Sequence, residues 1–231
     1  MNILCEEKIR LLVELAEKRK STDLRVYFGE TGDRYRHLGE FHGGIYDCHH
    51  VSPWTRSGGC PNASVMIVGQ DWSSAEHLEK DPPNPHMAVC GFDPNFLTNR
   101  NLNRLLARHL KTTRSACYLT NLFPFIKSGQ ANGFIPMGHL VRCATDFLVP
   151  QIEIVGPRAV ICLGLRTINA LGRAIGLSGA RQLADAIAAS PRLIDGTKIF
   201  AVAHTGSLGT KNREPEQVER DWQRIARLAE A

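Results

Sequence analysis

Four short runs of apolar residues recur along the chain, and none of them alternates with polar positions. The runs occupy residues 65–68 (VMIV), 117–119 (CYL), 160–163 (VICL) and 199–202 (IFAV). Continuous aliphatic and β-branched runs of this length are typical of strands that are buried on both faces, as in a parallel sheet. The pattern therefore predicts a central, mainly parallel, four-stranded sheet.

Helical periodicity fills the segments around these runs. Apolar residues recur there at spacings of three and four, which places them on one face of a helix. These residues are Ile9, Leu12, Val13 and Ala16; Leu102, Leu105 and Leu106; Leu140, Val141, Ala144, Leu148 and Ile152; Ile168, Leu171 and Ile175; and Val218, Trp222, Ile225 and Leu228. Strands that alternate with helices predict an α/β fold in which helices flank the sheet.

Residues 29–62 lack this periodicity and are rich in glycine, histidine and polar residues. Loops of this length are usually functional or disordered. Because the segment retains several large aromatic side chains, we interpret it as a long ordered loop. The expected organisation is a single domain over residues 1–231, with an N-terminal helix and long loop in 1–62 and an α/β core in 63–231.

Composition and charge narrow the class of protein. The chain has 231 residues, a formal net charge of +5 and a pI near 8.9, a mildly basic balance that permits a nucleic-acid partner without requiring one. Its seven cysteines include no C-x-x-C pair, so we expect a reducing compartment and a cytoplasmic location. No apolar run approaches the ~20 residues of a membrane helix, and no membrane partner is expected.

Polar residues follow three of the predicted strands where each strand ends. Asp71, Asn121 and His204 hold these places. Since ligands of open α/β sheets bind beyond the carboxyl ends of the strands, an acid, an amide and an imidazole would meet at one edge. Each has an ordinary alternative, as a cap, a turn residue or a surface histidine respectively. Their common position favours a shared site.

The residues at these strand ends resemble motifs of the uracil-DNA glycosylase superfamily. Gly69-Gln70-Asp71 is similar to the start of the G-Q-D-P-Y-H motif of family 1, and residues 204–208 (HTGSL) resemble its H-P-S-P-L-S loop. Thr120-Asn121-Leu122 looks like the strand-end asparagine segment of the superfamily. The likeness covers residues 64–213.

The resemblance implies a three-layer α/β/α fold and an enzyme that hydrolyses the N-glycosidic bond of uracil in single- or double-stranded DNA, leaving an abasic site for base excision repair. A monomer is expected. Two alternatives keep the fold: a glycosylase for hypoxanthine, xanthine or mispaired thymine, and a non-catalytic binder of damaged DNA. A protein that binds a small nucleotide is disfavoured, because the sequence contains no G-x-G-x-x-G and no G-x-x-x-x-G-K-[ST] motif.

The resemblance also implies roles for individual residues. Asp71 would orient the attacking water and stabilise the cationic sugar, while His204 would donate a hydrogen bond to uracil O2. Asn121 would read the base edge, because its amide both donates and accepts hydrogen bonds. The backbone of Gly69-Gln70 would line the base pocket, with the Gln70 N–H also near O2.

Three aromatic residues are candidates for the walls of this pocket. Phe96 is the first choice for stacking on the base and Phe92 the second, and an aromatic residue here equally suits a core. Trp72-Ser73 replaces the Pro-Tyr of the family motif, in which the tyrosine guards against the thymine methyl group. Trp72 therefore either takes over this guard or only packs.

The segment after His204 carries candidate contacts to DNA. The resemblance puts Leu208, next to Ser207, in the space that the flipped base leaves, and an ordinary turn leucine is the alternative. Lys211 and Arg213 are candidates for binding phosphates, and a solvated basic loop is the alternative.

No metal and no cofactor are expected. Residues 143–152 and 157–164 are similar to the C-x-x-x-x-L-x-x-Q-I helix and the next strand of the bacterial iron–sulfur branch. However, Phe125 stands at the third cysteine position of that branch and only Cys143 persists, so we predict no cluster. A zinc site is the alternative for four residues with suitable donor atoms, Cys48, His49, His50 and Cys60, whose spacing is not that of a standard finger.

Overall fold

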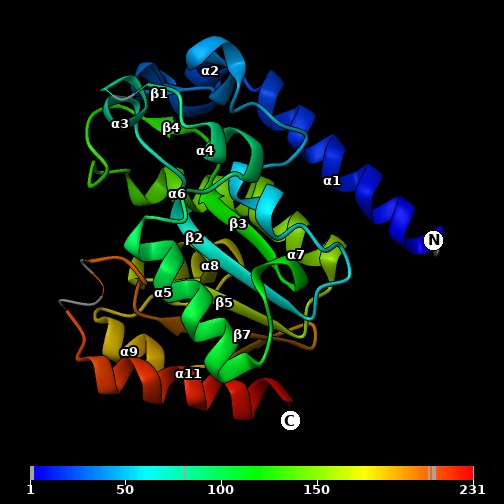
Figure 1. Cartoon of the computed structure of the whole chain (residues 1–231), viewed down its shortest axis with the longest axis vertical. Coiled ribbons are helices and arrows are strands. Elements are labelled where there is room, and N and C mark those ends of the chain that lie inside the picture. The colour runs from blue at the N-terminus through cyan, green and yellow to red at the C-terminus, as the bar shows by residue number, and fades with distance from the viewer. Residues whose placement is uncertain (1–2, 81, 208, 210–211, 231) are drawn as a thin grey trace.

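A five-stranded sheet runs through the middle of the molecule (Figure 1). The computed structural model describes residues 3–80, 82–207, 209 and 212–230. The strands lie in the order β3-β2-β5-β7-β6, and the first four are parallel. Their bounds are Tyr118–Phe123 (β3), Val65–Asp71 (β2), Ala159–Leu163 (β5), Thr197–Val202 (β7) and Arg192–Ile194 (β6). The four apolar runs therefore form the parallel part of the sheet, as predicted.

The predicted number of four strands is wrong, because β6 adds a fifth at the edge. β6 pairs antiparallel with β7 through a tight turn at Asp195-Gly196, where φ is 45° and 83°. The strand has three residues, and Leu193 in its middle is 69% exposed. Such a strand has no apolar run, although Asp-Gly is itself a strong hairpin signal.

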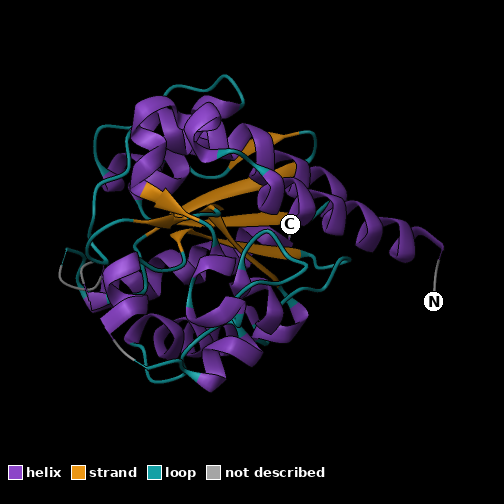
Figure 2. Cartoon of the chain, turned by 90° about the horizontal axis from the view of Figure 1, so that it is seen from above, coloured by secondary structure: helices purple, strands orange, loops and turns teal. Residues whose placement is uncertain are grey.

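Helices cover both faces of the sheet (Figure 2). Alternate residues of a strand point to opposite faces, so Met66 and Val68 of β2 join the core on one side while Ile67 joins the core on the other. The first side is packed by α6 (Met137–Cys143), α7 (Val149–Val155) and α8 (Leu165–Ala174), and the second by α5 (Leu97–Leu105) and α11 (Pro215–Glu230). This is the expected three-layer α/β/α arrangement.

The remaining helices of the core are short. α3 (Ala75–Lys80) and α4 (Pro85–Cys90) follow β2, and α9 (Leu183–Ala188) precedes β6. The periodic segment predicted around residues 140–152 forms α6 and α7, joined by a π-helical turn at Ala144–Leu148. Pro150 lies just after this turn and has no N–H to donate, which disturbs regular α-helical pairing there.

Across the described ranges, no helix has both the length and the apolar character needed to cross a bilayer.

The N-terminal part of the chain packs beside β3. α1 (Ile3–Ser21) and α2 (Leu24–Phe28) lead into residues 29–62, which form short 3-10 turns and β1 (Tyr35–Arg36). β1 pairs antiparallel with β4 (Ile126–Lys127). Leu38, Phe41, Tyr46 and Trp54 are at most 5% exposed. The segment is therefore folded onto the core, with more regular structure than a loop.

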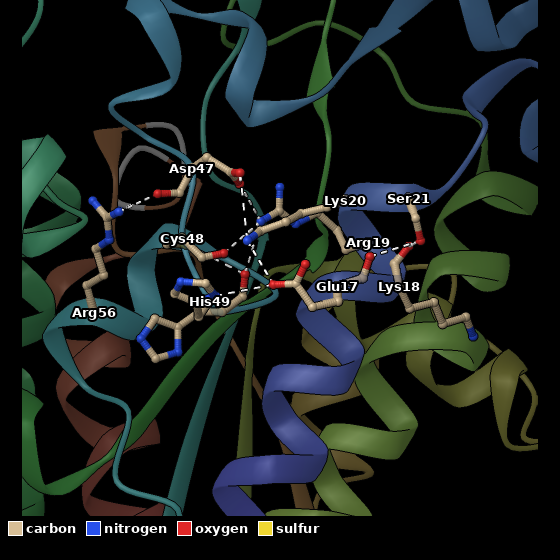
Figure 3. A network of polar contacts seen from close by, with 10 residues as sticks. Glu17, Lys18, Arg19, Lys20, Ser21, Asp47, Cys48, His49 and Arg56 are labelled. Carbon is tan, nitrogen blue, oxygen red and sulfur yellow. Dashed lines mark hydrogen bonds and ion pairs between the residues drawn. The ribbon is translucent and has the colours of Figure 1, made fainter.

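Polar contacts tie the end of α1 to this segment (Figure 3). The fully buried side chain of Arg19 places its Nη2 2.9 Å from Asp47 Oδ1. Arg56 Nη2 donates to the carbonyl oxygen of Asp47 at 2.6 Å. Close by, Thr55 Oγ1 donates to the carbonyl oxygen of Leu119 in β3 at 2.6 Å, so the segment is fixed to the edge of the sheet.

Candidate functional site

A cavity of about 860 Å³ opens at the carboxyl ends of the parallel strands. Asp71 ends β2, Asn121 lies in β3, and His204 follows β7; all three line this cavity. The parallel pairing of β2 with β3 brings the ends of these two strands together, because Gly69 in β2 lies opposite Asn121 in β3. Five further residues from the sequence analysis share the lining: Gly69, Gln70, Trp72, Phe92 and Phe96.

The carboxylate of Asp71 accepts a hydrogen bond on each oxygen. Lys127 Nζ lies 2.8 Å from Oδ1, and Gln70 Nε2 lies 2.8 Å from Oδ2. Gln70 is held in turn by Arg166, whose Nε donates to Oε1 at 3.1 Å. Arg166 also donates through Nη2 to the carbonyl oxygen of Ile135. The carboxylate is therefore held in place by a chain of polar contacts from β2, β4 and α8.

The amide of Asn121 is oriented by a hydroxyl group from the N-terminal segment. The Trp54 backbone N–H donates to Ser52 Oγ at 3.2 Å, and Ser52 Oγ donates to Asn121 Oδ1 at 2.6 Å. Ser52 and Asn121 are 1% and 3% exposed, so water does not compete for this bond. The bond assigns Oδ1 as acceptor and leaves Nδ2 as the donor of the amide.

Gly69 allows this amide to lie against the backbone of β2. A Cβ atom on Gly69 would lie 2.6 Å from Asn121 Nδ2 and 3.2 Å from Trp54 Cζ3. Trp54 cannot easily move away, because its Nε1 donates to Asn99 Oδ1 at 3.2 Å within the core. The glycine of the G-Q-D segment is therefore needed for packing at this point.

The imidazole of His204 is held as a neutral ring. Burial is the main cause that lowers its pKa; nearby Asp71 opposes this effect and Lys127 adds to it. The Gly206 N–H donates to Nδ1 at 3.0 Å, so the proton of the neutral ring is on Nε2. α5 holds the same loop, because Asn101 Nδ2 donates to the Thr205 carbonyl oxygen at 2.8 Å.

The candidate aromatic residues differ in how far they are held by neighbours. Trp72 donates through Nε1 to the Gly91 carbonyl oxygen at 2.8 Å and packs edge-on against Tyr46 at 5.3 Å between ring centroids. The guanidinium of Arg114 lies 4.2 Å over the ring of Phe92, which is half-buried. Phe96 is 40% exposed at the cavity, so it is the more accessible of the two phenylalanines.

The loop after His204 contains the residues predicted to contact DNA, and the structure describes only some of them. Leu208 and Lys211 lie outside the described residues, and Ser207 is exposed. Arg213 makes a two-point contact with Asp221 of α11, with Nε–Oδ2 at 2.5 Å and Nη2–Oδ1 at 2.9 Å. The guanidinium of Arg213 is therefore engaged within the fold, and sequence spacing gave no sign of that partner.

The residues considered as metal ligands make contacts with other groups of the protein. Cys48 is buried with its Sγ 3.6 Å from the His50 carbonyl oxygen, and His49 is exposed and contacts Glu17 (Figure 3). Cys143 is fully buried, and burial raises the pKa of its thiol well above the usual value. Among the residues that the structure describes, no group of three or more His, Cys, Asp or Glu residues is arranged to hold a metal ion.

Sequence reasoning missed three residues that shape the site. Lys127, Arg166 and Ser52 contact the predicted acid or amide directly or through one side chain. Lys127 directly follows a buried apolar stretch, residues 122–126, and a lysine there is the one local signal. The sequence around Ser52 and Arg166 contains no such signal, because the positions of these residues depend on how distant segments pack.

The sheet and its cavity define a three-layer α/β/α protein with its ligand site at the carboxyl edge of the strands. A sequence model described as the Uracil DNA glycosylase superfamily matches residues 57–226. The chain belongs to this superfamily and is thus a DNA glycosylase, a hydrolase of DNA repair that acts on DNA. Among curated proteins, none matches the chain.

Proposed function

We propose that the chain hydrolyses the N-glycosidic bond of uracil in DNA and leaves an abasic site. The observation that carries this proposal is the fixed amide of Asn121 in the same cavity as Asp71 and His204. A base inside a duplex cannot reach such a cavity, so the nucleotide is flipped out of the helix before cleavage.

Asn121 selects the base. Its Oδ1 keeps one acceptor site beside the Ser52 bond and accepts from uracil N3–H, while Nδ2 donates to O4. Cytosine presents an amino donor where uracil has O4, and this donor would face Nδ2. Each buried polar group left without a partner costs roughly 1–3 kcal/mol, so cytosine is bound less well than uracil. Phe96 stacks on the base in this arrangement, with Phe92 as the alternative.

Asp71 and His204 share the charge that develops as the bond breaks. Water oriented by Asp71 attacks C1′ of the sugar, the bond from C1′ to the base breaks with its electron pair leaving on the base, and the proton that the water loses ends on the departing base. The carboxylate stabilises the positive charge on the sugar, and His204 Nε2–H donates to uracil O2 as negative charge builds there. Preorganised groups aimed at developing charge usually give the largest catalytic contribution. The Gln70 backbone N–H and Gly69 complete the pocket wall.

Contacts outside the pocket hold the DNA. Ser207, exposed after His204, contacts the strand next to the flipped nucleotide. Leu208 fills the space that the base leaves, and Lys211 binds phosphate. Arg213, whose guanidinium contacts Asp221, is the second candidate for a phosphate contact.

The test is incubation with single- and double-stranded oligonucleotides that carry one uracil, followed by alkali to cut abasic sites. Strand scission at the uracil is the expected result, with none on the matched cytosine oligonucleotide. Asp71→Asn and His204→Ala each lower release by about 100-fold or more while the melting temperature stays close to that of the wild type. Full activity in both variants would rule out this mechanism.

Trp72 favours a second candidate within the same fold, a glycosylase for another deaminated or mispaired base. Trp72-Ser73 stands where family 1 has Pro-Tyr, so Ser73 holds the place of the guard tyrosine, and the indole of Trp72 beside it is held by contacts with Gly91 and Tyr46. A release assay on hypoxanthine, xanthine and G·T-paired thymine distinguishes the candidates by which free base appears. Tight binding of uracil-containing DNA without any free base would instead indicate a non-catalytic binder.

A further inference from the structure

Lys127 lines the cavity although its side chain is only 3% exposed. Its Nζ lies 2.8 Å from Asp71 Oδ1. Burial of an ammonium group costs much free energy, and one carboxylate partner only partly offsets that cost. A lysine retained at this depth beside Asp71 therefore requires an explanation beyond packing.

Backbone pairing fixes Lys127 from two sides. It lies opposite Tyr35 in the antiparallel pair of β1 and β4, and an isolated bridge joins it to Ser74, shortly after Asp71 in the chain. The lysine backbone is thus held between the N-terminal segment and the connection that leaves β2. Its buried side chain then brings Nζ to Asp71 in a defined direction.

Lys127 and Gln70 together fix the Asp71 carboxylate. One donor occupies each oxygen, and every carboxylate oxygen has a second acceptor site. The carboxylate can therefore accept a water molecule without losing either anchor. Arg166 restrains Gln70, so rotation of the carboxylate would break contacts on both sides.

The same ammonium group acts on His204. Burial and Lys127 lower the pKa of His204, whereas Asp71 raises it. The lysine therefore opposes the effect of the carboxylate on the His204 pKa, while burial remains the main cause that lowers it. A neutral ring keeps Nδ1 as the acceptor of the Gly206 N–H and retains Nε2–H as the group that donates into the cavity.

We propose that Lys127 is a positioning residue for base release, which holds the Asp71 carboxylate in one orientation through the contact of its Nζ with Oδ1. The inference rests on the proposed glycosylase function, in which Asp71 and His204 act on the sugar and the base. Lys127 itself makes no bond to the substrate in this scheme.

The first experiment is single-turnover release of uracil by Lys127→Met, with DNA affinity measured by fluorescence anisotropy. The rate is expected to fall about tenfold or more, while the dissociation constant changes less than about threefold. Lys127→Arg, which keeps the cation, recovers part of the rate. Lys198→Met is the matched control, because Lys198 Nζ contacts the Leu228 carbonyl oxygen at 2.8 Å away from the cavity, and its rate stays at the wild-type value.

A double-mutant cycle decides whether Lys127 acts through Asp71. In an Asp71→Asn background, Lys127→Met is expected to cause no further loss, because the group that it positions is already inactive. This double variant contains no unpaired buried charge, so it remains measurable if Lys127→Met alone does not fold. An additional tenfold loss in the double variant would mean that Lys127 acts on the DNA directly.

A covalent role is tested with borohydride during the reaction. If the amine of Lys127 condensed with C1′ of the abasic sugar and released water, reduction of the resulting C=N bond would trap the protein on DNA. Trapping that disappears in Lys127→Met would overturn the positioning role. Wild-type protein that releases no uracil contradicts the proposed function itself, whereas uracil release at the wild-type rate by Lys127→Met contradicts only the role of Lys127.

Discussion

Single hydrogen bonds decide how the side chains of the cavity present themselves. Ser52 gives its hydroxyl proton to Asn121 Oδ1, and the donor and acceptor ends of the amide follow from that one bond. His204 gains its tautomer in the same way from the Gly206 N–H. The chemistry available to a base in this cavity is therefore set by residues that need not contact it.

Ser52→Ala tests this at the scale of one residue. Loss of a buried hydrogen bond, roughly 1–2 kcal/mol, frees the amide to rotate and lowers the rate of uracil release about tenfold. Thr55→Val is the matched control, because Thr55 bonds the Leu119 carbonyl oxygen in the same turn and does not contact Asn121. Quantified uracil release by both variants checks the expectation, and equal rates would contradict it.

The sequence allowed Asp71, Asn121 and His204 to be predicted as one cluster, because each closely follows an apolar run that is recognisable in the sequence, and all three line the cavity. The sequence did not allow Lys127 or Ser52 to be predicted as residues of the site. Lys127 reaches the site through the pairing of β1 with β4, and Ser52 through its bond to Asn121, 69 residues away in the chain. Local patterns do not encode such contacts.

At the scale of elements, the close approach of β2 and β3 sets the shape of the pocket floor. The four parallel strands were predictable because each is buried on both faces, whereas β6 was not because its three residues alternate in exposure. The register that places Gly69 opposite Asn121 could not be predicted from the sequence. A shift of one residue between the two strands would reverse which side chains face the cavity.

Gly69→Ala tests the importance of this approach. The new Cβ would lie 2.6 Å from Asn121 Nδ2, so the amide or the strand end must shift, and uracil release is expected to fall about 100-fold. Gly138→Ala in α6 is the control, because no atom lies within 4 Å of its Cβ position and alanine favours the helix. A Gly69→Ala variant with wild-type release in the single-turnover assay would contradict the packing argument.

At the scale of the whole molecule, partial burial of several histidines makes stability depend on pH. Burial is the leading cause that lowers the pKa of four histidines, His37, His50, His139 and His204. Below the ordinary histidine pKa of about 6.5, the unfolded chain binds more protons than the native one, so acid favours unfolding. The stabilisation from neutral burial is complete above that pH and is lost as pH falls through the lower native values.

Urea titrations at pH 7.5 and 5.5 measure this dependence. The midpoint is expected at lower urea at pH 5.5, and His50→Gln should reduce the difference because one buried imidazole is removed. Exposed carboxyl groups in general have an ordinary pKa near 4, which lies below this window. A midpoint that is unchanged or rises on acidification would contradict the assignment to buried histidines.

The segment before residue 57 contributes contacts that shape the cavity. Ser52 and Tyr35 lie outside the matched region of residues 57–226, yet one orients the amide of Asn121 and the other pairs with the strand that carries Lys127. We therefore expect substitutions at these two positions to alter the cavity even where every residue of the matched region stays the same.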